Sequence, residues 1–548
     1  MKIKKIISLI LLIFVVAGIF SSCSNKIVEI SDEALEYAVR KEIGKDKGNI
    51  YQSDLDKITY LFLPQAEVCD LSELNKLENL TELELTCDEL NDVSVLNNLT
   101  NLETLTLNLT KLTDISSLNN SPNLTHLNLN IAETCDLRSI SNLSNLTHLE
   151  LTYPILKDIY ILNNLTNLET LTLNLTKLTD ISDLSSLINL KHLDFNLTKL
   201  SDMSVLSNLT KLETLTFYST EISDMSVLEN LTNLTKLSIT SPELSDISAL
   251  NNLTKLETLT LYSAELSDIS VLKNLTNLTE LSITSPKLKN ISALNNLTNL
   301  TKLDLDSREL GNVDVFSLLF VDDTKLNDIS VLSNLTNLTK LGLFCPELKD
   351  ISVLKNFKKL ELLNLDVTNI SDISALSDLT DLVYLSLVMR YFTRLKDISV
   401  FENFKKLEML NLNNIIINDI SALNNLTNLT KLYLRNTGVS DISVLSKLPN
   451  LTELDISSNT EVSDISVLSS LTNLTKLYLR NTEVSDISVL SKLPNLTELD
   501  ISSNTEVSDI SVLSSLTNLK SLTLGPSTNI PQAQIDALKE ANPNITIE

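Results

Sequence analysis

The sequence predicts an α/β repeat solenoid, a curved horseshoe of about 21 coils with a period in the range of 20–29 residues. We expect parallel strands on its concave face and short 3-10 or helical turns on its convex face. A helical N-terminal cap and a helix–strand C-terminal cap should close its ends. Residues 98–116 and 164–182 are identical, NLTNLETLTLNLTKLTDIS, and the second copy begins three periods of about 22 residues after the first. The chain of 548 residues has only seven glycines, too few for many tight hairpins, which depend on glycine at positive φ.

The beginning of the chain predicts an export signal over residues 1–22. Three lysines, Lys2, Lys4 and Lys5, precede an apolar run over 6–20. This run is shorter than the roughly 20 residues of a membrane span, and its basic start and small final residues are typical of a secretory signal. The sequence F-S-S-C that ends at Cys23 resembles the lipobox of bacterial lipoproteins. The resemblance implies a bacterial protein exported to the cell envelope and anchored to the membrane by a lipid on Cys23. An ordinary signal peptide that carries a cysteine is the alternative.

Residues 23–78 are expected to form the anchor and the N-terminal cap. An apolar core that ends in an exposed coil needs a cover. The stretch 30–58 predicts two short helices, for which Ser31 and Ser53 are the expected N-caps.

Residues 79–525 are expected to contain the repeats. In each coil an L-x-L core, such as Leu105 and Leu107, alternates at period 2 and predicts a short strand with one face inward. A D-I-S tail follows, and its aspartate precedes a run too short for a full α-helix. We expect this carboxylate to cap the exposed N–H groups of a helical turn. The aspartates at this position include Asp114, Asp180, Asp246, Asp268, Asp441 and Asp486.

The triplet N-L-T recurs along most of the chain and would be a glycan acceptor in a secreted eukaryotic protein. Within the repeat period, however, its leucine falls in the core. Its asparagine and threonine fall where the coil turns, and should meet backbone groups there. We therefore interpret N-L-T as part of the architecture.

Two steps depart from the mean period. These are intervals between equivalent positions of successive predicted strands. The interval from Leu305 to Val321 is shorter than the period, and the interval from Leu387 to Leu412 is longer. We expect these stretches to bend the solenoid or to bulge from it.

Residues 526–548 predict the C-terminal cap. Pro531 should start a helix and Pro543 should end it, and a last strand should follow over 545–547. Both ends of the apolar core would then be covered.

The stretch LTNLTKLYLRNTEVSDISVLSKLPN, residues 471–495, resembles the leucine-rich repeats of bacterial internalin-like surface proteins. The resemblance covers about residues 28–548. It implies a curved parallel solenoid whose concave strand face binds proteins, often host receptors. Internalins usually continue into an immunoglobulin-like segment and a wall-sorting signal, and this sequence contains neither. The asparagine ladder of the family is mostly threonine here, with Thr110, Thr176 and Thr437 at its positions and asparagine at Asn459 and Asn504.

The four cysteines after Cys23 are expected to be unpaired thiols. Cys69 and Cys135 share one repeat position three coils apart, about 14 Å at strand spacing. A disulfide needs Cα atoms within roughly 7 Å. Cys87 and Cys345 share another position and lie farther apart still. No C-x-x-C occurs, so nothing indicates a zinc site.

Composition and motifs exclude several classes of function. A formal charge of −27 argues against a nucleic-acid partner. No nucleophile–base pairing, phosphate loop or metal spacing is found, so we expect neither an enzyme nor a cofactor. His126 and His148 occupy equivalent positions on adjacent strands near Glu150, which is the one arrangement that suggests a metal. His192 recurs at the same frame two coils on, with Thr170 between, as expected of an exposed position that has drifted.

The residues beside the inward leucines should face the concave surface. Early coils place small polar groups there, such as Thr104, Thr106 and Asn108, whereas later coils place aromatic and basic groups. Tyrosine and arginine are enriched at protein interface hot spots. The expected partner-binding residues are Tyr218, Tyr262, Phe344, Tyr384, Lys431, Tyr433, Arg435, Lys476, Tyr478 and Arg480.

The last part of this surface is a duplication. Residues 428–472 recur as 473–517 and differ only at Gly438 and Glu483. Lysine and glutamate alternate on successive strands of the two copies, which also describes a cross-strand charge ladder. Copying whole coil pairs would reproduce such a ladder without any ligand.

Our leading hypothesis is a lipid-anchored bacterial surface protein that binds a protein partner, from a host or a bacterial surface, in adhesion or envelope contact. The chain itself should be a monomer. A carbohydrate or cell-wall binder that uses the Thr/Asn-rich early coils is the second hypothesis, and a structural surface spacer is the third. The aromatic stretches 316–322 and 388–395 argue against a spacer, which needs no such interruptions. The sequence does not name the ligand.

Overall fold

The computed structural model describes most of the chain from residue 26 onward. The described residues are 26–64, 71–88, 90–131, 135–175, 177–196, 200, 202–218, 225–305, 326–366, 370–388, 393–525 and 530–548. Cys23, Cys69, Thr176 and the stretch 316–322 lie outside them. The chain divides into two compact units, Met1–Pro242 and Glu243–Glu548.

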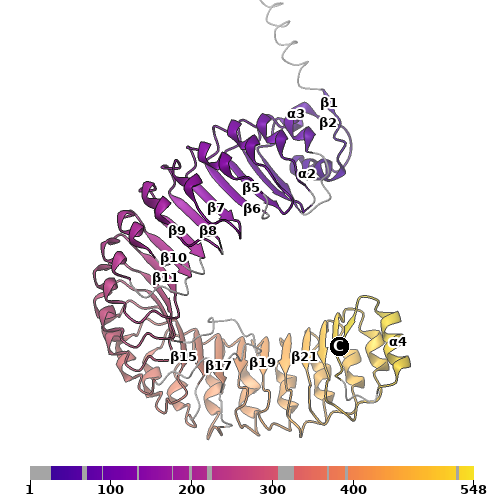
Figure 1. Cartoon of the computed structure of the whole chain (residues 1–548). Helices are drawn as coiled ribbons and strands as arrows, with labels where there is room; N and C mark the ends of the chain where they lie inside the picture. The colour runs from indigo at the N-terminus through magenta and orange to yellow at the C-terminus, as the bar shows by residue number, and fades with distance from the viewer. Residues whose placement is uncertain are drawn as a thin grey trace, which may run out of the picture. The chain divides into compact units, whose positions relative to one another are not determined.

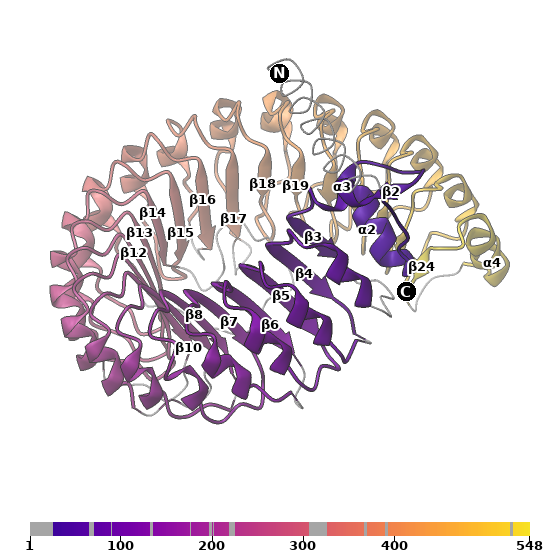
Figure 2. The ribbon, with the colours of Figure 1, turned by 90° about the horizontal axis from the view of Figure 1, so that it is seen from above.

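The first unit is a stack of coils whose strands pair in parallel. Leu61 pairs with Leu83, Leu83 with Leu105, and the same step continues to Leu237. Figure 2 shows β3 to β8 lying side by side. The strands are β3 (Tyr60–Leu63), β4 (Glu82–Thr86), β5 (Thr104–Leu109), β6 (His126–Ile131), β7 (His148–Thr152), β8 (Thr170–Asn174), β9 (His192–Asn196), β10 (Thr214–Tyr218) and β11 (Lys236–Thr240).

Leucines from the strands and the turns fill the interior of this unit. Leu105 and Leu107 of β5 have no exposed surface, whereas Thr104 and Thr106, which alternate with them, are partly exposed. The 3-10 turns, from η1 (Ser72–Lys76) to η8 (Ser226–Asn230), lie on the opposite side of the coil. Within the unit the strands line the concave side and the turns the convex side (Figure 1). The predicted arrangement of the coil is confirmed.

The aspartate of the D-I-S tail caps the 3-10 turn. Asp114 Oδ1 accepts a hydrogen bond of 2.8 Å from the backbone N–H of Ser116, the first residue of η3 (Ser116–Asn120). In one coil Asn290 takes this position and accepts from Ser292 N–H at the same distance, so an amide oxygen serves as well. The same bond, at 2.8 Å, is made by Asp180, Asp246, Asp268, Asp441 and Asp486.

The N-L-T triplet joins each coil to the coil before it. Asn233 Nδ2 donates to the backbone oxygen of Thr210 at 2.9 Å, and the Thr235 hydroxyl donates to that of Glu213 at 3.1 Å. Leu234 between them is fully buried. The interpretation of N-L-T as architecture is therefore confirmed. The same asparagine bond recurs at Asn123, Asn145, Asn277, Asn299 and Asn450.

A small cap precedes the first strand of the sheet. It holds two helices, α2 (Glu33–Ile43) and α3 (Gln52–Leu55), and a short antiparallel pair, β1 (Ile27–Val28) with β2 (Ile50–Tyr51). The two helices were expected from the sequence, and the β1–β2 pair was not.

The expected N-caps of these helices are wrong. Asp32, not Ser31, caps α2 by accepting from Leu35 N–H at 2.9 Å. The α3 helix begins before Ser53, and the Asp54 carboxylate accepts from Tyr51 N–H at 3.1 Å. A carboxylate carries a full negative charge to the positive end of a helix, which a serine hydroxyl does not.

The second unit continues the same architecture with some longer steps. Its 3-10 turns run from η9 (Ser248–Asn252) to η20 (Ser511–Ser515). The strands are β12 (Thr258–Tyr262), β13 (Glu280–Thr284), β14 (Lys302–Leu305), β15 (Lys340–Phe344), β16 (Leu362–Asp366), β17 (Tyr384–Val388), β18 (Met409–Asn411), β19 (Lys431–Tyr433), β20 (Glu453–Asp455), β21 (Lys476–Tyr478), β22 (Glu498–Asp500), β23 (Ser521–Thr523) and β24 (Thr546–Ile547).

One irregular step is confirmed and the other is not. Leu385 of β17 lies opposite Leu410 of β18, which is the long step expected there. At the other place β14 pairs directly with β15, and Leu303 lies opposite Leu341. The interval from Leu303 to Leu341 is longer than the period, whereas the sequence predicted a shorter interval, from Leu305 to Val321. Because the two strands are hydrogen-bonded neighbours, the strand expected at Val321 does not separate them.

Two buried asparagines tie the duplicated coils together. Asn459 Oδ1 accepts from the N–H groups of Thr437 and Gly438 at 3.0 and 2.9 Å, and from the Thr437 hydroxyl at 3.0 Å. Its Nδ2 donates to the backbone oxygens of Leu434 and Ile456, both at 2.8 Å. Asn504 bonds Thr482 and Leu479 in the same way one copy later. These are the two asparagines that stand in the otherwise threonine-rich ladder.

The C-terminal cap forms as the sequence predicts. The helix α4 (Gln532–Ala541) begins directly after Pro531 and ends before Pro543. Strand β24 then pairs with β23, with Ile547 opposite Leu522. None of the helices within the described ranges is long and apolar enough to cross a membrane.

Three of the four later cysteines can be placed. Cys87, Cys135 and Cys345 are buried, and no disulfide joins them, as expected. Burial, with a smaller effect of Asp114, raises the pKa of Cys135 to about 12. This thiol is therefore protonated and poorly reactive at neutral pH.

The aspartate caps make stability depend on acid in a predictable direction. The Ser N–H, and next the Ser hydroxyl, hold the pKa of these carboxyls below their ordinary 3.8. A carboxyl whose pKa is lowered in the folded state contributes stability at pH values above 3.8. This contribution is lost as the pH falls through the pKa of the folded state. The five caps considered are Asp419, Asp441, Asp464, Asp486 and Asp509.

We predict that replacing all five caps by asparagine leaves urea unfolding at pH 7 nearly unchanged and makes the loss of stability below pH 4 shallower than in the parent. The amide of Asn290 already makes this cap bond. The control is Glu461→Gln/Glu483→Gln/Glu506→Gln, which removes exposed charge from the same coils. An equally shallow acid profile in the control would assign the effect to net charge instead.

A second prediction concerns Asn459. Asn459→Ala should lower the free energy of unfolding by roughly 3–5 kcal/mol, because it leaves several buried backbone groups without a partner. Asn473→Ala, which removes one exposed bond to Pro449, should cost less than about 1 kcal/mol. Chemical unfolding of both variants measures this, and similar losses would contradict the role of Asn459.

Candidate functional site

Side chains that do not enter the core form a face along the strands of each unit. In the first unit many of them bond one another across neighbouring strands. Asn108 Nδ2 donates to the Thr86 hydroxyl, and Asn174 Nδ2 to the Thr152 hydroxyl, both at 3.2 Å. The early coils therefore present a polar surface whose groups are partly satisfied by each other.

The histidine pair of this unit is a stacked pair. His126 and His148 lie opposite each other in register, with ring centroids 4.0 Å apart and planes 13° from parallel. Burial and then the field of His126 lower the pKa of His148, so its ring is neutral at neutral pH. Glu150 accepts from Asn128 at 2.8 Å. Throughout the described part of the chain, no three His, Cys, Asp or Glu side chains lie close enough to hold a metal ion.

The aromatic residues expected on the strand face differ in their exposure. Tyr218 in the first unit is 45% exposed and Tyr262 in the second is 41% exposed, and Tyr384 is half-buried. Phe344 and Tyr433 are only 6% and 4% exposed. Their rings, which we expected to contact a partner, offer little surface.

Two exposed rings were missed by the sequence analysis. Tyr60 and Phe62 of β3 are 36% and 38% exposed and project from the same strand. The stretch Tyr60–Leu63 has the alternation of the repeats, and Tyr60 lies one period before Glu82. That signal was present in the sequence, but it fell in the region 23–78 that we assigned to the anchor and cap.

The duplicated end carries the expected charge ladder. Lys431 Nζ lies 3.4 Å from Glu453 Oε2, and Lys476 Nζ lies 3.2 Å from Glu498 Oε2. The register also places Glu453 opposite Lys476. These lysines are thus engaged by carboxylates of the neighbouring strands, and such pairs contribute a few tenths to about 1 kcal/mol each.

The tyrosines and arginines beside the ladder divide into covered and open groups. The Tyr478 hydroxyl donates to Glu498 Oε1 at 2.8 Å. Burial and then Glu498 raise the pKa of Tyr478, and burial and then Glu453 raise that of Tyr433. Arg435 is half-buried and Arg480 is exposed. The accessible groups of this surface are therefore Arg480 and parts of the half-buried Arg435 and Tyr478.

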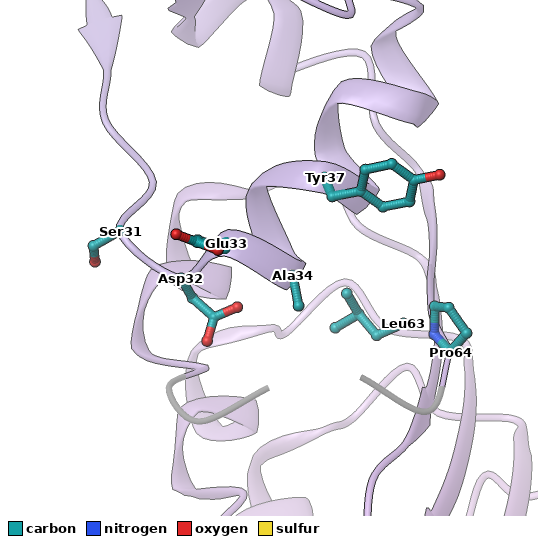
Figure 3. Close-up of a pocket in the computed structure, with 7 residues that line it drawn as sticks. All are labelled: Ser31, Asp32, Glu33, Ala34, Tyr37, Leu63 and Pro64. Carbon is teal, nitrogen blue, oxygen red and sulfur yellow. The ribbon is translucent and has the colours of Figure 1, made fainter. Parts of the chain in front are cut away.

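One cavity of about 550 Å³ lies at the N-terminal cap (Figure 3). The start of α2 and the end of β3 line it, including Glu33, Tyr37 and Leu63. Asp32 at its edge already caps α2, and Tyr37 is 68% exposed. The cavity is open and part of the cap, and it holds no set of catalytic groups.

Models of two repeat families match parts of the chain. The model described as Leucine Rich repeats (2 copies) matches residues 427–470 and 472–515. The model described as BspA type Leucine rich repeat region (6 copies) matches residues 152–242 and 216–317. No curated protein matches the chain.

Three bacterial proteins of solved structure have chains similar to this one. An internalin (inlF) from Listeria monocytogenes is 23% identical over 90% of this chain and 94% of its own, with a TM-score of 0.23. An internalin C2 from the same species is 28% identical over 50% of this chain and 93% of its own, with a TM-score of 0.24. A leucine-rich-repeat protein from Leptospira interrogans is 18% identical over 87% and 98%, with a TM-score of 0.42.

The coil and the matched repeat models define the class of this protein. A parallel strand, a 3-10 turn and buried leucines recur once in each period in both units. The chain is a leucine-rich-repeat protein, and its central coils match the BspA-type repeats. Proteins of this class are mostly scaffolds for protein interaction.

Proposed function

We propose that this protein is exported by a bacterium, held to the membrane by a lipid on Cys23, and binds a protein partner through the strand face of its second unit. The binding serves adhesion or contact within the envelope. The observation that carries the proposal is the surface formed by Arg435, Tyr478 and Arg480 on the two coils of the second unit that flank β20, where Arg480 is exposed and Arg435 and Tyr478 are half-buried.

Three features support this proposal. Repeat proteins of this kind present extended strand surfaces that commonly bind other proteins. Arginine and tyrosine are the residue types that contribute most at interface hot spots. The asparagine bonds of Asn459 and Asn504 hold the coils beneath this surface in a fixed geometry, so little ordering is needed when a partner binds.

The same surface argues for the kind of partner. Its charges nearly balance, because acidic groups of β20 and β22 stand beside the basic groups of β19 and β21. The chain as a whole carries a net charge of −27, which disfavours nucleic acid. A protein with a mixed polar and aromatic surface fits best, and the free chain acts as a monomer without a cofactor.

Binding is tested with the chain from residue 24 onward on arrays of purified host and bacterial surface proteins and of glycans. Arg435→Ala/Tyr478→Ala/Arg480→Ala should weaken a protein hit at least tenfold, since hot-spot side chains contribute about 2 kcal/mol or more. Tyr433 is left intact because removing its buried ring would cost roughly 3 kcal/mol of stability.

The matched control is Lys447→Ala/Lys492→Ala/Tyr160→Ala. It removes two cations and one ring from exposed positions on 3-10 turns, and it should bind like the parent. Glycan binding that the strand variant leaves unchanged would contradict the proposal. If the folded chain binds none of the proteins on the arrays, the proposal is contradicted as well.

The anchor is tested separately. In a bacterium that processes lipoproteins, the full chain should fractionate with membranes and take up labelled fatty acid, whereas Cys23→Ser should do neither. Cys345→Ser, a change at a buried cysteine, should keep the label. Membrane association and labelling that survive Cys23→Ser would refute a lipid on this residue.

A further inference from the structure

The first strands of the sheet carry two exposed rings, each facing a carboxylate. Tyr60 and Phe62 of β3 are 36% and 38% exposed. In the register of β3 with β4, Tyr60 lies opposite Glu82 and Phe62 lies opposite Glu84. Directly opposite residues of adjacent strands are about 5 Å apart. The same pair, one aromatic ring beside one carboxylate, therefore occurs twice in succession along the two strands.

This surface has a negative field without a balancing cation. Burial raises the pKa of Tyr60, and Glu84, Glu82 and Glu42 raise it further, so three carboxylates lie near one ring. None of the three takes part in a salt bridge in the described part of the chain.

The nearby lysines of the cap are directed elsewhere. Lys45 Nζ lies 2.5 Å from Asp54 Oδ2, and Lys57 Nζ lies 3.8 Å from Asp54 Oδ1. These two lysines therefore pair with Asp54 and not with the carboxylates beside Tyr60 and Phe62. The carboxylates beside Tyr60 and Phe62 are left to attract a cation from outside.

The geometry also sets the spacing of the ligand. Tyr60 and Phe62 are two residues apart on one strand, about 7 Å. Alternate side chains of any extended polypeptide have the same spacing and point to the same side. A cation held over a ring face gains about 0.5–2 kcal/mol, and the carboxylate opposite each ring adds an ion pair to each site.

We propose that β3 and β4 form a docking surface for an extended segment of a partner protein with arginine or lysine at alternate positions. Each cation lies against one ring and its opposite carboxylate, Tyr60 with Glu82 and Phe62 with Glu84. The surface belongs to the first unit, so it does not depend on the arginines of the second unit that the proposed function uses.

Charge complementarity favours this occupant over others. An acidic peptide or an anionic lipid surface would be repelled by the three carboxylates. A single quaternary ammonium group would use one ring and leave the second ring–acid pair without a role. Two equivalent pairs at strand spacing match a ligand whose cations repeat at that spacing.

The test is fluorescence anisotropy of a labelled peptide of alternating arginine and alanine, at an ionic strength of about 0.15 M, where only short-range charge contacts persist. The parent chain should bind it. Glu82→Gln/Glu84→Gln should weaken binding roughly tenfold, and Tyr60→Leu/Phe62→Leu roughly fivefold, which correspond to about 1.4 and 1 kcal/mol. A peptide of the same composition with its arginines in one block should bind more weakly than the alternating one.

Matched controls separate this surface from the general acidity of the chain. Glu229→Gln/Glu243→Gln removes two exposed carboxylates elsewhere, and Tyr160→Leu removes an exposed ring from a turn. Both should bind the peptide like the parent. Thermal unfolding monitored by circular dichroism should show that all variants are folded, as expected for changes outside the apolar core.

Several results would overturn the proposal. Equal losses in the Glu82/Glu84 and Glu229/Glu243 variants would show non-specific attraction. Equal affinity for the alternating and the block peptide would show that binding does not depend on cations spaced at alternate positions of an extended strand. Self-association of the chain that Glu82→Gln/Glu84→Gln abolishes would assign the surface to a second copy. Binding to phosphatidylcholine vesicles with the same dependence would assign it to a lipid headgroup.

Discussion

The structure depends on one constraint, which is that a single coil cannot bury its own leucines. Each coil offers a thin apolar edge, and only the coils on either side cover it. Hydrogen bonds reinforce the same contact, since Asn233 and Thr235 donate to backbone oxygens one coil earlier. The caps at both ends follow from this constraint, because the first and last coils would otherwise expose leucine to water.

This constraint decides where function can lie. The inward leucines and the N-L-T triplets hold neighbouring coils together. The aspartates cap the turn of their own coil. Changing any of these residues affects stability first. The side chains beside the strand leucines do not enter the core, so they can differ from coil to coil. They vary from threonine and asparagine in early coils to the ring–acid pairs of β3 and β4 and to Arg435 and Arg480, which follow β19 and β21. The strand face therefore carries the information that distinguishes this solenoid from others of its class.

Features set by the period could be predicted from the sequence, and features set by neighbouring coils could not. The strands, the turns, the Asp114 cap and the C-terminal helix recur at fixed positions. The burial of Phe344 and Tyr433 depends on the size of side chains in adjacent coils, which periodicity does not encode. The site residues Tyr60 and Phe62 were missed because their strand, although it lies one regular period before β4, falls in the region 23–78 that we assigned to the anchor and cap. Asp32 caps α2 because its charge favours the helix end, but serine and aspartate are both common N-cap residues, so the motif alone does not choose between Ser31 and Asp32.

The most direct test of coil-to-coil stacking is hydrogen exchange of residues 428–472 and 473–517. Apart from Gly438 and Glu483 the two copies are identical, so differences in exchange report position in the stack and not sequence. If each coil is stabilised by its neighbours, the inner copy, 428–472, should be protected more strongly than the outer copy, which lies nearer the end of the sheet. Equal or greater protection of the outer copy would contradict this account.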